Sequence, residues 1–473
     1  MMATRLSNLT ASCRHFGECD RLMRGLLLGL LAFSLLLKLA LILQTGPHGK
    51  SIFEMEYGFG GVIDNLYHRN SLEACGIAYA LDFCGVAFRM PLLPFLYAKL
   101  AMLIGTSQIA LAITKAIVFQ VLMAASLLYL FNILAKFPIR RLVLVLVTGL
   151  TLLGPQYLKH SISVQYEESL LLDLFIVYFS LLVGVVIKQR LGQTLSAADR
   201  AIVVVLALIG CSLYFIKSSL ILFGLVAIAA PVWLLKTPAW LRIAVFLPFV
   251  IGFIGWGWFN ASYHGEVRLT SSYNGENFYR GQNPYTYRMY PDINLDRIID
   301  SREVQLNNGE ILKLPDWTVN FPKFTSEWQW HDYFQNLGKQ WIRENPGQAL
   351  ELTLRKLYVI FLEPGKVPFR QSGQLGAETL DYSLATFLAG KAWIVLMRFL
   401  FFVALGMAIK HLWRRDEDWR PALVFLLFIG AYIAPYVAGF AYQRHITPLL
   451  VFAVYAWPLL SLPGVSASTR MPD

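Results

Sequence analysis

Long, uninterrupted apolar runs separated by polar segments dominate the chain. A helix needs about 20 mostly apolar residues to cross the hydrocarbon layer of a bilayer. The strands of a membrane barrel would be about 10 residues long and would alternate in polarity, which these runs do not. The pattern therefore predicts an all-α polytopic membrane protein with about ten spans. The expected spans lie near residues 22–43, 108–135, 142–153, 168–187, 201–216, 219–235, 243–261, 389–409, 421–439 and 446–461.

Basic residues orient these spans, because lysine and arginine collect in cytoplasmic loops. Arg21 and Arg24 stand at the start of the first span, and the basic segment KHLWRRDEDWR at 410–420 precedes the last two. Both ends of the chain are therefore expected inside, and segments 45–106 and 262–344 outside. The first apolar run is long and lacks a small-residue cleavage site, so we expect it to stay as a signal anchor.

Segment 262–345 differs from the rest in being polar, aromatic and rich in Asn and Gly. Long loops are usually functional or disordered, and the Trp and Tyr content argues against disorder. We expect a small extracytoplasmic subdomain here, between a transmembrane module at 1–261 and C-terminal helices at 346–473. A helix at 345–364 starts with the N-cap and proline signal Asn345-Pro346. It is short and basic, which favours an interfacial or re-entrant helix over a short span.

The composition excludes several classes of function. The 473 residues are 56% hydrophobic and 15% charged, against about 25% charged in soluble proteins. The net charge of +11 needs no nucleic-acid partner, because basic loops are normal in membrane proteins. The five cysteines lack metal-site spacing, so no metal and no other cofactor is expected. Cys75 and Cys84 share the first external loop and either form a disulfide or stay as two thiols.

Two carboxylates, Glu54 and Glu56, directly follow the first span. Two close carboxylates raise the pKa of one of them, which suits a general base that deprotonates a hydroxyl. A solvated acidic start of the loop is the alternative. Asp64 also fits the polar face of an amphipathic helix.

A second acidic pair, Glu167 and Glu168, opens the fourth span, where the helix dipole favours anions. The dipole is a sufficient reason for one carboxylate. Two of them, with Lys159 and His160 a few residues upstream, favour a site.

Three cations stand at the expected outer ends of helices, against the usual cytoplasmic bias: Arg89, Lys217 and Arg444. Each could reach lipid headgroup phosphates by itself. If they converge, they would form a pocket for the phosphate or diphosphate of a lipid, with bidentate contacts from Arg. The chain has no Gly-rich phosphate loop, zinc spacing or nucleophile elbow, which excludes a Walker-type ATPase. An enzyme of this kind must use an already activated substrate.

Five stretches carry a family resemblance through their order and common sidedness. They are IDNLYHRNSLEA with FRMPLLPFLYA (63–98), GPQYLKHSISVQYEESLLLDL (154–174), SYNGENFYRGQNPY (272–285), ENPGQALELTLRKL (344–357) and YQRHITPLL (442–450). They resemble the motifs of the GT-C superfamily of polyprenyl-phosphate-sugar glycosyltransferases, in particular the bacterial relatives of protein O-mannosyltransferases and the lipid A aminoarabinose transferase. The resemblance implies a GT-C-type bundle of about 10–13 helices with amphipathic external helices.

The resemblance also assigns expected roles. Glu56 matches the acid of the family's first loop, with Glu54 close behind, and Glu168 matches the second acidic position. The family commonly has Asp or Asp-Glu in this loop, whereas this chain has Glu-Met-Glu, which leaves the base open between the two. The basic positions near the lipid head are matched by Arg89, Lys217 and Arg444. Further substrate contacts are expected from Asp64, Lys159, His160, Tyr166, Glu167, Asn277, Asn283 and His445.

The function implied is an inverting sugar transfer from a polyprenyl-phosphate donor to a glycan, lipid or protein acceptor. A loop-one Glu would accept the hydroxyl proton, and the cations would stabilise the leaving phosphate. The expected place is a bacterial inner membrane, with the active site facing the periplasm. One alternative is a polymerase or ligase of lipid-linked glycans, which would rely on Arg and His. Another is a lipid or glycan transporter, which would need polar residues inside the spans and internal repeats; the sequence shows neither convincingly.

Overall fold

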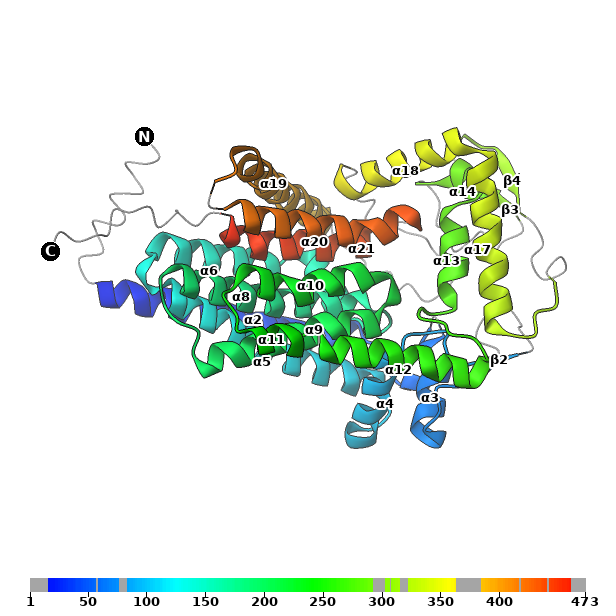
Figure 1. The fold of residues 1–473 in the computed structure, drawn as a ribbon, viewed down its shortest axis with the longest axis horizontal. Helices are drawn as coiled ribbons and strands as arrows, with labels where there is room; N and C mark the ends of the chain where they lie inside the picture. Colours follow the sequence, from blue (N-terminus) through cyan, green and yellow to red (C-terminus); the bar gives the residue numbers. More distant parts are fainter. Residues whose placement is uncertain are drawn as a thin grey trace.

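The computed structural model consists mainly of helices, most of them running side by side in one bundle (Figure 1). It describes residues 16–56, 58–75, 83–291, 303–306, 308–314, 322–362, 384–416, 418–439 and 442–460. The helices of the bundle are α2 (Phe16–Thr45), α4 (Leu92–Ile104), α5 (Gln108–Ile133), α6 (Pro138–Leu152), α7 (Pro155–Ser161), α8 (Glu168–Arg190), α9 (Ala197–Ile216), α10 (Ile221–Leu234), α11 (Ala239–Ala244), α12 (Leu247–His264), α19 (Leu384–Arg414), α20 (Trp419–Ala438) and α21 (Gln443–Ala456). Short 3-10 turns connect α5 to α6, at η2 (Leu134–Lys136), and α9 to α10, at η3 (Ser218–Leu220); a third, η4 (Trp457–Leu459), follows α21.

Seven helical segments of the described chain are long and apolar enough to cross a membrane, so this is a multi-pass membrane protein. They are Asp20–Thr45, Gln108–Lys136, Glu168–Arg190, Ala197–Ile216, Ala239–His264, Leu388–Arg414 and Trp419–Ala438. Each coincides with an expected span. The other three expected spans are less regular. The third is a pair, α6 and α7, bent by 62°, and the segments Ser218–Leu234 and His445–Leu459 are shorter apolar helices.

Helix α8 forms the centre of the bundle, and 89% of its apolar stretch of 18 residues is buried. It packs against α5, α9 and α21. Its aromatic side chains interlock with those of the surrounding helices: the ring of Phe175 lies 4.9 Å from that of Phe223, and Phe179 lies 5.0 Å from Phe428 and 5.2 Å from Phe452. Such offset contacts between large rings fill the core without strain, so α8 is a rigid support for whatever its first residues carry.

Charged side chains, among them Lys38, Lys115 and Asp173, lie inside the bundle, where the sequence shows no convincing polar set. Lys38 of α2 and Asp173 of α8 form an ion pair at 3.4 Å, and both are fully buried. The hydroxyl of Tyr157 donates to Asp173 at 2.6 Å and accepts from Lys38 at 2.9 Å. Lys115 of α5 is also buried and donates to the carbonyl of Ser163. The expectation of apolar spans is therefore wrong for this half of the bundle.

The segment between α2 and α4, called loop one, contains η1 (Ile52–Glu54), α3 (Phe59–Arg69) and a two-stranded ladder, β1 (Ala74–Cys75) with β2 (Cys84–Gly85). The strands are antiparallel, and Cys75 pairs with Cys84 in the ladder. A disulfide joins these two cysteines, which decides between the two alternatives left by the sequence. The bridge fixes the chain just before Arg89.

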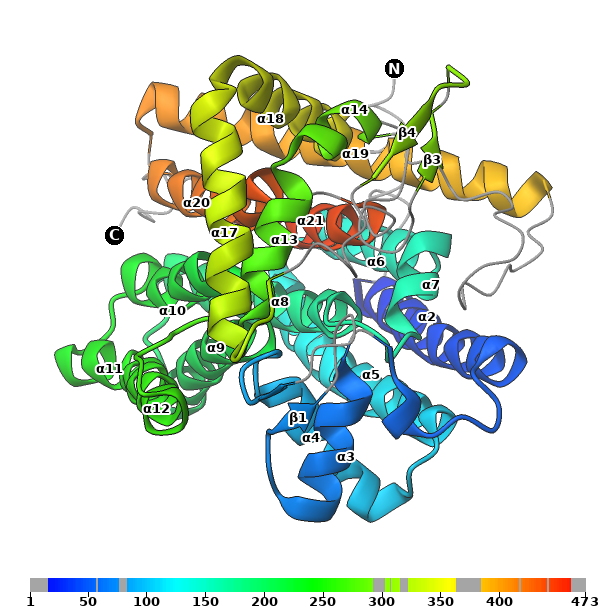
Figure 2. The same ribbon diagram turned by 90° about the vertical axis from the view of Figure 1, so that its right-hand side faces the viewer.

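The expected subdomain follows α12. It contains α13 (Tyr273–Gly281), α14 (Pro284–Met289), the hairpin β3 (Glu303–Gln305) with β4 (Ile311–Lys313), and α17 (Glu327–Glu344). Helices α13 and α17 lie side by side across one end of the bundle, roughly perpendicular to its helices (Figures 1 and 2). They can approach closely because Gly275 has no side chain. A Cβ at this position would lie 2.2 Å from the carbonyl oxygen of His331. The ring of Tyr279 lies 5.5 Å from that of Phe334 and completes this contact.

Helix α18 (Pro346–Phe361) begins at the expected proline and has 16 residues. It is not among the segments that could span the membrane. Leu350, Leu354 and Tyr358 are exposed along one face. On the other face, fully buried Lys356 donates to the carbonyls of Gly281, at 2.7 Å, and Val437. The helix thus joins the subdomain to the end of α20, and its exposed apolar row is typical of an interfacial helix.

Candidate functional site

Charged side chains gather where α8 begins, α9 ends and α21 begins. Figure 2 looks onto this end of the bundle, where α13 and α17 cross in front of α8 and α9. Glu168, the first residue of α8, is 1% exposed. It forms an ion pair with Lys217, which caps the end of α9, and a second contact with His445 of α21, whose Nε2 lies 3.1 Å from Oε1. Three residues expected to form the site are therefore in direct contact.

Lys217 stays cationic in this setting. Burial alone would lower its pKa, but the carboxylate of Glu168 outweighs that effect and raises the pKa above its ordinary value. The ammonium group also lies 5.6 Å from the centroid of the Tyr436 ring. Sequence reasoning missed Tyr436, because one Tyr near the end of an apolar run is typical of any membrane boundary.

Arg89 lies between two aromatic rings. Its guanidinium carbon is 4.7 Å from the ring centroid of Phe59 in α3 and 4.5 Å from that of Tyr273 in α13. The guanidinium lies 3.7 Å from the carboxylate of Glu167. A guanidinium with aromatic rings over its faces presents its N–H groups at the edge. Loop one and the subdomain thus position this cation together.

The two loop-one glutamates have different roles. Glu54 accepts a hydrogen bond from the backbone N–H of Ser51 at 2.9 Å and so caps η1. The exposed Glu56 has its backbone N–H bonded to Gln165 Oε1 at 3.1 Å, two residues before Glu167. Within the described part of the chain, the Glu56 carboxylate forms no ion pair. Glu56 therefore lies beside the charged cluster with its carboxylate open to solvent, whereas Glu54 performs a local structural task.

Other expected residues lie outside the cluster. Asp64 is exposed on α3 and faces His68 at 3.5 Å, one helical turn later, as expected for a polar helix face. Asn283 is fully buried and caps α14, accepting from the Thr286 N–H at 2.7 Å and donating to Tyr279. Its amide is thus fully used in shaping the subdomain.

The remaining expected residues border the cluster less directly. His160 is buried in α7, with its ring 6.3 Å from that of Tyr166, and Lys159 beside it is half-buried. Asn277 is half-buried in α13. Arg444 belongs to the first turn of α21, but its side chain lies outside the described residues.

A hydroxyl and amide network, which sequence reasoning missed, ties the subdomain to the residue after Lys217. Ser218 Oγ accepts from Asn274 Nδ2 at 2.9 Å and lies 3.2 Å from Ser271 Oγ. Both partners lie at the start of α13. Ser271 directly precedes Ser272, and Asn274 directly follows Tyr273, the first residue of the helix. The sequence gives no sign of this network, because Ser218 and its partners are more than 50 residues apart in the chain. The network holds α13 over the cluster.

An apolar groove of about 600 Å³ lies between loop one and the neighbouring helices. Its walls come from α3, α4, α9, α12 and the strand end of loop one, and include Leu66, Val86, Phe95, Leu208, Phe215 and Phe259. Phe215 precedes Lys217 by two residues, and Val86 precedes Arg89 by three. The groove therefore runs along the same two segments that carry the cations.

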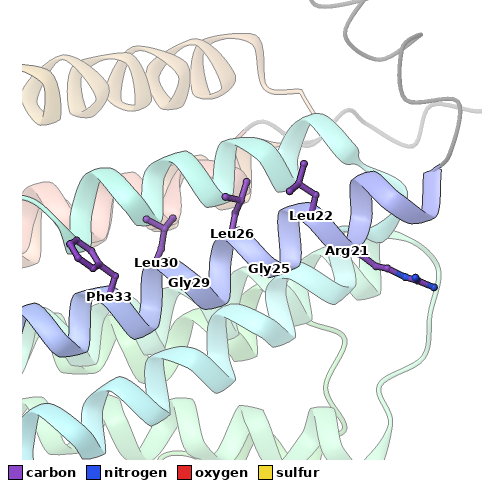
Figure 3. A pocket seen from close by; sticks show the side chains of 7 residues that line it. All are labelled: Arg21, Leu22, Gly25, Leu26, Gly29, Leu30 and Phe33. Carbon is purple, nitrogen blue, oxygen red and sulfur yellow. The ribbon is translucent and has the colours of Figure 1, made fainter.

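A second, shallow groove runs along the N-terminal half of α2 (Figure 3). Apart from Arg21 at its end, it is lined by Leu, Gly and Phe side chains on one helix face. It contains no carboxylate and lies toward the opposite end of the bundle from α13 and α17 (Figure 1). This groove is a lipid-facing surface rather than a centre of chemistry.

Among the described residues, His411, Asp416 and Asp418 bring potential metal ligands within 4.8 Å of one another. They lie between α19 and α20, at the opposite end of the bundle from the cluster. His411 already bonds Asp416 at 2.7 Å, and Arg190 forms an ion pair with Asp418. These side chains form a network of ion pairs at that end of the bundle.

No family model, no curated protein and no solved structure matches the chain.

Proposed function

We propose that this protein is an integral-membrane glycosyltransferase that moves a sugar from a polyprenyl-phosphate donor to an acceptor hydroxyl at the extracytoplasmic face. One observation carries the proposal. Arg89 lies against Glu167 and Lys217 pairs with Glu168, so both cations lie near the start of α8, where α13 and α17 cross the end of the bundle. The chain segments directly before the two cations line an apolar groove. These two half-buried cations would bind a lipid phosphate, and the apolar groove would hold its tail.

The chemistry would be a single displacement. The acceptor oxygen attacks the anomeric carbon, the bond from that carbon to the phosphate oxygen breaks, and the anomeric centre is inverted. Arg89 and Lys217 would stabilise the negative charge that grows on the leaving phosphate. The groove along α9 and α12 would hold the first part of the polyprenyl tail. Helices α13 and α17 would exclude water from the sugar.

Glu56 is the best-placed base in this proposal. A general base must be free to accept a proton, and the Glu56 carboxylate is exposed beside the cluster. Glu168 is engaged by Lys217 and His445, so it serves to orient these two groups. Glu54 is used as a cap.

The test uses purified protein in nanodiscs with a panel of polyprenyl-phosphate sugars. Glu56→Gln should lower donor turnover at least a hundredfold, roughly the contribution of a general base. Glu54→Gln is the matched control, because it removes a carboxylate two residues away, and it should retain most of the turnover. If the panel fails to yield a consumed donor, or if Glu56→Gln turns over as fast as wild type, the proposal or its base is wrong.

One observation favours a transporter as a second candidate. Buried ionisable residues inside spans often mark ion or proton pathways, and Lys38, Asp173 and Tyr157 form such a set. A transporter would lose substrate flux into proteoliposomes on Asp173→Asn. A glycosyltransferase would show no flux in wild type. The same reconstituted protein therefore separates the two functions.

A further inference from the structure

A fully buried carboxylate, Glu327, lies at the start of α17 and receives hydrogen bonds from four groups. The backbone N–H groups of Val86 and Ala87 donate to Oε1 at 2.9 and 3.0 Å. The hydroxyl of Ser272 donates to Oε2 at 2.7 Å, and His264 Nε2 lies 2.7 Å from Oε1. One side chain therefore joins loop one, the end of α12, the start of α13 and α17.

Two of these partners lie close in the chain to Arg89 itself or to Tyr273, whose ring covers it. Ala87 is two residues before Arg89, and Ser272 directly precedes Tyr273, whose ring covers the guanidinium. The backbone N–H of Ser272 also donates to the carbonyl of Ala87 at 2.8 Å. The carboxylate thus holds both segments in a fixed relation at the point where they approach Arg89.

We propose that Glu327 is a positioning residue, which fixes Arg89 in the site by clamping residues 86–87 of loop one to the start of α13. The inference rests on the proposed function, in which Arg89 binds the donor phosphate. Burying a carboxylate is costly unless donors satisfy it. Four donors from three other segments satisfy Glu327, so removing its charge loosens all three segments together.

The approach of loop one to Glu327 also depends on Gly85. A Cβ added at Gly85 would lie 2.7 Å from the Glu327 carboxyl group. Gly85→Ala should therefore push the clamp apart from the loop-one side. This gives a second variant that disturbs the same contact without changing the carboxylate.

The first experiment measures hydrogen exchange by mass spectrometry in nanodiscs and needs no substrate. In wild type, the peptides with residues 84–91 and 271–275 should be protected. Glu327→Gln replaces one accepting oxygen with an NH₂ group, although the surrounding donors need an acceptor there. Both peptides should therefore exchange at least tenfold faster in this variant. Gly85→Ala should have the same effect. Glu344→Gln is the control in the same helix, because Glu344 bonds only to Gln340 on the surface among the described contacts. Unchanged exchange in Glu327→Gln overturns the clamp.

The second experiment follows donor kinetics. A merely structural role would lower the active fraction, so apparent kcat would fall while KM stayed the same. A displaced Arg89 instead raises KM for the donor, by roughly tenfold or more. In an Arg89→Ala background, Glu327→Gln should raise KM little further, because its effect passes through Arg89. Additive effects on KM, or a change in kcat alone, overturn the positioning role.

The two experiments keep the proposals distinct. If wild type consumes no donor, the glycosyltransferase proposal fails. Binding of farnesyl phosphate then replaces KM in the same double-mutant comparison, together with the exchange data. Weaker binding in Glu327→Gln, absent in the Arg89→Ala background, supports the positioning role. Equal binding in wild type and Glu327→Gln overturns it.

Discussion

His445 Nε2 lies 3.1 Å from Glu168 Oε1 and joins the first turn of α21 to the first residue of α8. The other ring nitrogen, Nδ1, accepts from the backbone N–H of Tyr442 at 3.1 Å. The neutral ring therefore carries its proton on Nε2 and donates it to Glu168. The ring also stacks on Tyr436 at 4.4 Å. The C-terminal helices thus help hold the carboxylate that Lys217 binds.

The first prediction concerns this contact. His445→Phe keeps a ring to stack on Tyr436 but removes the donor to Glu168. Donor turnover should therefore fall roughly ten- to a hundredfold, since a hydrogen bond to a charged group contributes about 1.5–3 kcal/mol. His68→Phe is the control, because His68 is exposed and contacts only Asp64 and neighbouring rings among the described residues. Equal turnover in His445→Phe and wild type would separate His445 from the site.

Much of the architecture could be predicted because it depends on local sequence. The long apolar runs predicted the seven spans, and Asn345-Pro346 predicted the start of α18. The same signal occurs at Asn283-Pro284, where Asn283 caps α14. The family resemblance suggested a substrate contact for Asn283, whereas the Asn-Pro pair alone predicts the helix cap that is observed.

The rest depends on contacts between distant segments. Lys38 and Asp173 lie 135 residues apart, and a single charge in an apolar run gives no sign of its partner. Glu54 and Glu56 look equivalent in the sequence and are both exposed, yet only the Glu54 carboxylate caps the turn of η1. Glu327 lies in a segment without any recognised motif. Its importance appears only when α17 is packed against loop one.

The second prediction separates Arg89 from a simple positive charge. Arg89→Lys keeps the charge but loses the planar group between Phe59 and Tyr273. The KM for the donor should rise about tenfold, measured in nanodiscs with a polyprenyl-phosphate sugar. Arg69→Lys, at the exposed end of α3, should leave KM unchanged. A normal KM in Arg89→Lys would show that charge alone is sufficient.

The third prediction concerns the buried ion pair. Removing one partner leaves an unpaired charge in the bundle, so Lys38→Met and Asp173→Leu should each destabilise the protein by about 3–5 kcal/mol. The double variant should recover much of this loss, because apolar groups replace both charges. Thermal unfolding in detergent, followed through the loss of helical signal, measures the three variants. A double variant as unstable as the sum of the singles would contradict the ion pair.

The fourth prediction concerns the disulfide. Cys75 and Cys84 both fall on the tryptic peptide 70–89, which should take up two alkyl groups only after reduction. Closing this short loop should contribute roughly 2–3 kcal/mol to stability. Replacing both cysteines by Ser should therefore lower the unfolding temperature and make loop one more sensitive to protease. Two alkyl groups on the unreduced peptide would exclude the bridge.

The fifth prediction is a pH effect at the junction of α18 with α20. Burial lowers the pKa of Lys356 to about 7, well below the ordinary lysine value of 10.5 that applies in the unfolded chain. Between these two values the unfolded state binds the proton that the folded state has released. Stability should therefore rise with pH through this window, by at most about 1.4 kcal/mol per pH unit from this group.

Lys356→Met tests this effect directly. Its stability should rise less steeply between pH 7 and pH 9 than that of wild type, because the titrating group is gone. The variant also loses the bonds to Gly281 and Val437, so at pH 9 it should be the less stable of the two proteins. Lys339→Met is the control, since Lys339 is exposed on α17 and bonds Gln335. If the stability of wild type and of Lys356→Met has the same pH slope, the buried lysine is charged throughout this range. The carbonyl groups of Gly281 and Val437, at the ends of α13 and α20, must then stabilise a positive charge.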